Sequence, residues 1–101
     1  MTDFLVAAKT SEISEGEGKI ISINGKEIAI FNVKNEFFAI DNACCHHGGP
    51  LGEGILDGAI ITCPWHHWKY NVMTGVNPIN PQIRVQTYEV KVENDEIKIR
   101  V

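Results

Sequence analysis

The sequence has 101 residues, of which 44% are hydrophobic and 22% are charged, and its formal net charge is -4. This length and composition are ordinary for one globular domain with a modest core. The acidic balance without a basic run excludes a typical nucleic-acid-binding protein. The sequence shows no signal-peptide pattern and no apolar run of the roughly 20 residues that a membrane span needs.

The chain consists of short β-branched and aromatic runs separated by turn residues, which is the pattern of antiparallel strands. In chain order, strands are predicted at residues 4–7, 19–23, 27–33, 36–40, 59–62, 68–72, 85–92 and 97–101. Hairpin turns are predicted at Asn24-Gly25, Lys34-Asn35 and Asn94-Asp95. No window has a sustained helical period. The sequence therefore predicts a single all-β domain over residues 1–101, built as a small antiparallel sandwich or barrel.

All 3 cysteines and all 4 histidines lie in two short segments, at residues 44–47 and 63–67. Thiolate and imidazole are ligands that suit iron, zinc or copper. Two metal sites fit these ligands: a tetrahedral Cys2His2 zinc site and a [2Fe–2S] centre held by two cysteines and two histidines. Each segment carries both ligand types, which favours the two-iron centre because each loop can then give a thiolate to one iron and an imidazole to the other.

Spacing alone leaves the choice of ligands open. Overlapping C-x-H pairs begin at Cys44 and at Cys45, and His66 competes with His67 as the histidine of the second segment. Both segments lie in predicted loops at strand ends, where rigid strands can hold ligands in place.

The two segments resemble the two cluster-binding boxes of the Rieske family. The first box reads C-x-H-x-G-G-P-L over residues 44–51, and the second reads C-P-W-H over residues 63–66. The following W-K-Y-N-V-x-T-G run over residues 68–75 resembles the family segment after the second box. Paired boxes at this separation are far more specific than either box alone.

The resemblance implies a Rieske-type [2Fe–2S] cluster and selects its ligands. Aligned on the G-G-P-L run, the ligands are Cys44, His46, Cys63 and His66. Cys45, His47 and His67 then become neighbours of the cluster, and His67 stands where the family often has glycine. The implied fold is a Rieske-like antiparallel β-sandwich or barrel with a cluster-binding subdomain at about residues 42–75 inserted between its strands.

Further expectations follow from the resemblance for residues around the boxes. Gly49 and Trp65 occupy the positions at which high-potential Rieske proteins carry an extra disulfide-forming cysteine, so the chain resembles the low-potential Rieske-type ferredoxins. Trp65 is expected to shield the cluster or contact a partner, and Trp68 to join the core. The proline-bearing loop at residues 76–82 is expected either to help cover the cluster or to be a plain connector.

The expected function is that of a cytoplasmic one-electron carrier that passes electrons from a flavin-dependent reductase to a terminal oxygenase or similar acceptor. The chain is expected not to be an enzyme by itself, and to bind neither nucleic acid nor membrane. Two alternatives remain at this point. One is the small subunit of an assimilatory nitrite reductase, and the other is a structural zinc module that mediates protein contacts.

Overall fold

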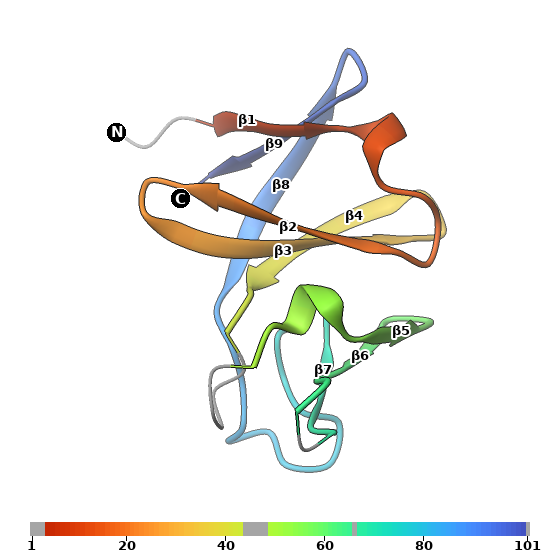
Figure 1. Cartoon of the computed structure of the whole chain (residues 1–101), viewed down its shortest axis with the longest axis vertical. Coiled ribbons are helices and arrows are strands. Elements are labelled where there is room, and N and C mark those ends of the chain that lie inside the picture. Colours follow the sequence, from red (N-terminus) through yellow and green to blue (C-terminus); the bar gives the residue numbers. More distant parts are fainter. Residues whose placement is uncertain (1–3, 44–48, 66, 101) are drawn as a thin grey trace.

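The computed structural model describes residues 4–43, 49–65 and 67–100. Six strands form one antiparallel sheet with the order β1-β9-β8-β4-β3-β2, and three short strands form a second sheet with the order β5-β6-β7. The strands are β1 Phe4–Lys9, β2 Gly18–Ile23, β3 Lys26–Val33, β4 Glu36–Asp41, β5 Ile55–Asp57, β6 Ile60–Thr62, β7 Lys69–Asn71, β8 Thr87–Glu93 and β9 Glu96–Arg100. Figure 1 shows the smaller sheet below the larger one. The predicted all-β antiparallel fold is confirmed.

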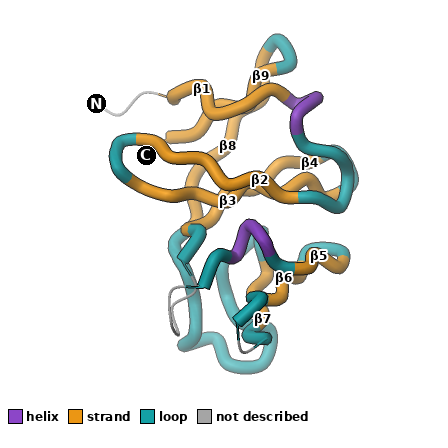
Figure 2. Tube along the Cα trace, viewed as in Figure 1, coloured by secondary structure: helices purple, strands orange, loops and turns teal. Residues whose placement is uncertain are grey.

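Helical structure in the described ranges is limited to two 3-10 turns, η1 at Thr10–Glu12 and η2 at Leu51–Glu53. Figure 2 shows these two turns in purple, with strands in orange and loops in teal over the rest of the described residues. Neither turn is long and apolar enough to cross a membrane.

The predicted hairpin turns occur between β2 and β3, between β3 and β4, and between β8 and β9. All six of their central residues have positive φ, among them Asn24 at 51° and Gly25 at 77°. Turns of this hand match the right-handed twist of the strands that they join. Asparagine, aspartate and glycine tolerate this conformation better than other residues do, which explains why the sequence marks these turns.

The two halves of the large sheet are joined where β4 and β8 pair at two positions, Ala39 with Tyr88 and Ile40 with Thr87. These halves enclose a first core, to which β1, β3, β4 and β9 each contribute. The buried members of this first core are Ala8, Ile13, Ile28, Ile30, Ala39, Ile97 and Ile99. The six strands of the large sheet therefore form a sandwich-like body, in which strands on both sides of the β4–β8 pairing share one apolar core.

A second core joins this body to the small sheet. Its buried members are Ala29, Phe31, Ile40, Leu51, Ile61, Cys63, Tyr70 and Val72. Strand β3 contributes to both cores, since Ile28 and Ile30 face the first core while Ala29 and Phe31 face the second. Alternate side chains of a strand point to opposite faces, so a strand buried on both faces must be apolar at consecutive positions. This requirement explains the unbroken apolar run at residues 28–31.

A side-chain hydrogen bond next to the β4–β8 pairing fixes the end of β4, the strand that leads to the first box. The Tyr88 hydroxyl donates to Asp41 Oδ1 at 2.6 Å, and the Asp41 N–H donates to the Gln86 carbonyl at 2.9 Å. Desolvation and this bond to a carboxylate raise the pKa of Tyr88 to about 12. Asp41 is the last residue of β4, so these bonds hold the chain just before it enters the first box.

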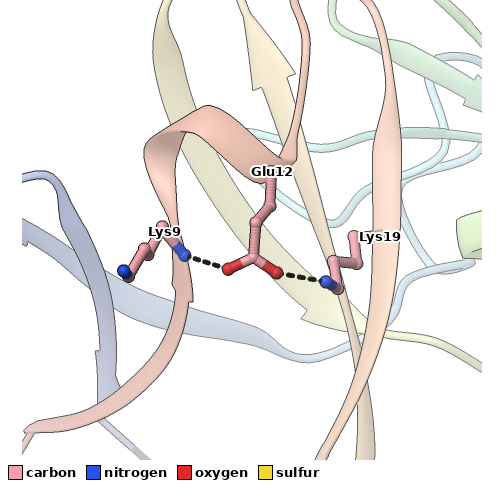
Figure 3. A network of polar contacts seen from close by, with 3 residues as sticks. All are labelled: Lys9, Glu12 and Lys19. Atoms are coloured by element: carbon pink, nitrogen blue, oxygen red, sulfur yellow. Dashed lines mark hydrogen bonds and ion pairs between the residues drawn. The ribbon is translucent and has the colours of Figure 1, made fainter.

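The connection from β1 to β2 carries an exposed polar network that is built on Glu12 (Figure 3). One carboxylate oxygen accepts the Lys9 backbone N–H at 2.8 Å, and the other accepts a bond from Lys19 Nζ. The hydrogen bond from Lys19, with that from Lys9, lowers the pKa of Glu12 below its usual value. These are solvated contacts that brace the η1 turn on the sandwich body.

Candidate metal centre

Cys63 is the one predicted ligand that lies within the described residues. Cys44, His46 and His66 lie outside them, as do the neighbours Cys45 and His47. Accordingly, the described part of the chain contains no group of three or more residues that could hold a metal ion. The geometry of the centre is therefore built from Cys63 and from the described residues at both ends of the two boxes.

Cys63 is held in place by the second core. It follows β6 directly, and only 1% of its surface is exposed. Its backbone N–H donates to the Trp68 carbonyl at 2.7 Å, so the second box begins and ends at a closed turn. Because β6 and β7 pair on either side of this turn, the position of the thiol is set by the sheet rather than by the loop alone.

The base of the first box is closed in a similar way by a buried asparagine. The Asn42 carbonyl accepts the Leu51 N–H at 2.7 Å, and Asn42 Oδ1 accepts the Gly52 N–H at 2.8 Å. Between them, Ala43 and Pro50 form an isolated β-bridge. Asn42 is only 4% exposed. Its three bonding groups, including its N–H to the Glu27 carbonyl at 3.1 Å, tie the start and end of the first box to β3.

The two boxes meet at Gly49. A Cβ placed on Gly49 would lie 2.8 Å from Cys63 Sγ and 3.1 Å from two ring atoms of Trp65. Real Cβ atoms do not approach a sulfur this closely, so only glycine allows the backbone of the first box to come so near to the thiol of the second. This contact places the described end of the first box against the Cys63 thiol, a soft donor that suits the iron of a [2Fe–2S] group. The described residues therefore fit the group that the sequence predicts.

The two tryptophans differ in burial. Trp68 is half-buried and packs against the second core, which confirms the prediction for this residue. Trp65 is 50% exposed although one edge of its ring lies against Gly49. An indole with one edge on the site and the rest in solvent can both shield the centre and offer apolar surface to a partner.

His67 adopts the left-handed backbone conformation, with φ of 59°. A residue with a Cβ pays about 1–2 kcal/mol for this conformation, whereas glycine does not. The frequent glycine of the resembling proteins at this position is thus explained by the backbone, and this chain keeps an exposed imidazole there in spite of the strain. Strain of this kind is most often retained at functional sites.

We expect His67→Gly to raise the melting temperature of the cluster-loaded protein by roughly 4 °C, because relief of about 1 kcal/mol shifts a domain of this size by that amount. His67→Ala is the matched control, since it removes the imidazole but keeps the strained Cβ. Differential scanning calorimetry of both variants checks the prediction. An equal gain in the alanine variant would show that the imidazole, and not the backbone, is responsible.

The loop after β7 is ordered by one asparagine beside the second box. Asn77 Nδ2 donates to the Lys69 carbonyl at 2.9 Å, and Asn77 Oδ1 accepts the N–H groups of Ile79 at 2.8 Å and Asn80 at 2.9 Å. The Asn77 N–H also donates to the Ile83 carbonyl at 2.8 Å. Side chains from the end of the loop, Ile83 and Val85, pack against the second core. The loop after β7 is therefore an ordered segment that packs on the second core beside the second box, and its role in covering the cluster stays a prediction.

Sequence reasoning missed Asn42 and Asn77, although both organise the site. Asn77 is followed by Pro78, and an Asn-Pro pair is a recognised signal of a turn that is closed by the asparagine side chain. For Asn42 no local sequence pattern indicates that its side chain is buried and closes the first box by a hydrogen bond, because its partner Gly52 is ten positions away.

Comparisons with known proteins agree with this geometry. The family model described as "Rieske [2Fe-2S] domain" matches residues 3–89. The ferredoxin component of the naphthalene 1,2-dioxygenase/salicylate 5-hydroxylase systems of Ralstonia sp is 35% identical, over 98% of this chain and 96% of its own length.

Two solved structures have the same fold. The Sphingomonas yanoikuyae B1 ferredoxin superposes with a TM-score of 0.88 at 29% identity, covering 98% of this chain and 99% of that one. A chain in the complex of reduced oxygenase and oxidized ferredoxin of carbazole 1,9a-dioxygenase superposes with a TM-score of 0.87 at 29% identity, covering 96% of this chain and 92% of that one. The Rieske interpretation of the paired boxes is confirmed over the zinc interpretation. Closed loops that meet at Gly49, a buried cysteine at their junction and the match over residues 3–89 lead to one conclusion: this chain belongs to the Rieske [2Fe-2S] domain family.

Proposed function

We propose that this chain is a ferredoxin that carries single electrons to a terminal oxygenase. The observation that carries the proposal is the buried Cys63 thiol against Gly49 in a chain that matches the Rieske domain over residues 3–89. The relative from Ralstonia sp is named as the ferredoxin component of a dioxygenase system, and its similarity spans nearly the whole of both chains. That breadth supports an electron-transfer component and not an enzyme by itself.

We propose Cys44, His46, Cys63 and His66 as the ligands of the cluster. A [2Fe–2S] centre supplies reversible one-electron chemistry when it is bound, and imidazole ligands on one iron raise its potential above that of an all-cysteine centre. The chain's own contribution is to hold the two boxes together. Asn42 closes the first box, the Cys63–Trp68 turn closes the second, and Gly49 lets them approach.

The proposed partners are a flavin-dependent reductase as electron donor and a terminal oxygenase as acceptor. The solved complex of carbazole 1,9a-dioxygenase, in which a ferredoxin is bound to its oxygenase, supports the acceptor by similarity. The reductase is the natural donor for a carrier without a nucleotide-binding motif. We further propose that residues 1–101 act as one domain with a cluster-binding subdomain at about residues 42–75, and that the protein works in the reducing cytoplasm, where cysteine ligands stay available.

Anaerobic purification tests the cofactor directly. We expect a red-brown protein with about two iron and about two acid-labile sulfide atoms per chain, and a potential near roughly −150 mV. Addition of the reduced protein to an oxygenase component should support substrate oxidation that depends on the carrier. A colourless protein with one tightly bound zinc, or a loaded protein that never delivers electrons to an oxygenase, would contradict the proposal.

A further inference from the structure

An apolar groove of about 410 Å³ lies beside the second box. Its lining comes from residues that continue directly from the box and from the loop after β7. The lining residues are His67, Trp68, Lys69, Asn77, Pro78, Ile79, Asn80 and Ile83. A protein that approaches the second box therefore meets this groove as part of the same surface.

Ile79 stands at the rim of the groove with 92% of its surface exposed. Its exposure does not come from a loosely held loop, because its own N–H is bonded to Asn77 Oδ1 at 2.8 Å. The loop is also closed below it by the bridge between Val76 and Arg84. An isoleucine held in place by an ordered loop is preorganised, and a preorganised anchor loses little entropy on binding.

The distribution of charge indicates what kind of surface fits the groove. Between residues 58 and 83 the only formally charged side chain is Lys69. The acidic excess of the chain lies outside this range, in the strands and turns of the sandwich body and in the β5 region. A partner surface that matches the groove is therefore apolar and nearly uncharged, and its association gains little from long-range charge attraction.

We propose that the groove receives an uncharged apolar side chain from the docking surface of the terminal oxygenase, with Ile79 as the anchor and His67 as part of the lining. The inference rests on the proposed function as an electron carrier, because electron delivery requires the acceptor to cover the end of the molecule that carries Cys63. It goes beyond that function by naming the contact that selects the partner. The backbone conformation of His67 supports this inference, because the chain keeps an imidazole at this strained position and the imidazole lines the groove.

The test measures oxygen consumption with saturating reductase while the ferredoxin concentration is varied. The acceptors are the oxygenase components of the naphthalene 1,2-dioxygenase system of Ralstonia sp and of carbazole 1,9a-dioxygenase. We expect Ile79→Ser to raise the KM for the ferredoxin about tenfold with kcat within about twofold, as for loss of a binding anchor. Ile79→Leu should stay close to the parent protein.

Ile55→Ser is the matched control, because Ile55 is 75% exposed on β5 and does not line the groove. Its KM should stay within about twofold of the parent, and oxidation of each reduced variant by ferricyanide should be unchanged. The KM should also change less than about threefold between roughly 0.05 and 0.3 M salt. Equal KM values for the two serine variants, or a steep salt dependence, would overturn the groove as docking site. A cluster-loaded parent protein that supports neither oxygenase would instead overturn the proposed function. It would also overturn the oxygenase as the protein that fills the groove.

Discussion

Cys63→Ser protein is expected to purify without the iron–sulfur chromophore. Iron in such a centre requires soft thiolate donors, and a serine hydroxyl stays protonated and hard at neutral pH. Cys63 is also fixed by the second core and by its N–H bond to Trp68, so the serine hydroxyl would occupy the place of the thiolate. Iron and sulfide analysis together with the visible spectrum measures the loss, which should be nearly complete.

Two further variants separate ligand loss from misfolding. Cys63→Ser keeps a polar group at this buried position and Cys63→Ala removes it, and both variants should fold and lack the cluster. In the first box, Cys44→Ser should behave like Cys63→Ser, and Cys45→Ser should keep the chromophore. Bleaching by Cys45→Ser together with survival of Cys44→Ser would show that the ligand register is displaced by one residue.

Gly49→Ala is expected to reduce cluster loading severalfold although it adds only one methyl group. The new Cβ would lie 2.8 Å from Cys63 Sγ, so the two boxes must move apart to accept it. Overpacking of this kind costs about 1–3 kcal/mol, and here the cost falls on the approach of the boxes that hold the cluster. The measurement is the ratio of visible absorbance to protein concentration, together with the EPR spectrum of the fraction that retains the cluster.

Gly18→Ala provides a control with a similar overlap elsewhere. Its Cβ would lie 2.6 Å from an atom of the Phe31 ring, which belongs to the second core but to neither box. This variant should lose stability while the cluster content and spectrum of each folded molecule stay normal. If both alanine variants kept full loading and an unchanged spectrum, the close approach at Gly49 would not be a requirement of the site.

Most of the sandwich could be predicted from the sequence because its signals are local. The turns at Asn24-Gly25 and Asn94-Asp95 carry their conformation in their own side chains, and the flanking runs are long enough to indicate strands. Strand β5 was not predicted, since Ile55–Asp57 is only three residues long and becomes a strand through its pairing with β6. The two 3-10 turns were missed for the same reason, because a three-residue turn has no periodicity.

For the site, the sequence could predict its chemistry but not its construction. The paired boxes indicated a two-iron centre, and the family match bears this out. The choice of ligands within the boxes remains a prediction. The approach of Gly49 to Cys63, the Asn42 hydrogen bond that closes the first box and the groove beside Ile79 could not be predicted, since each depends on residues that meet only when the small sheet packs on the sandwich body.

The burial of β3 on both faces limits how this protein can change through evolution. Ile28 and Ile30 serve one interior, and Ala29 and Phe31 serve the other. Adjacent residues of this strand thus pack in different cores. Truncation of a large side chain on either face lowers the free energy of unfolding by about 2–5 kcal/mol. Exposed loops can accept substitutions freely, whereas this four-residue segment has almost no freedom to change.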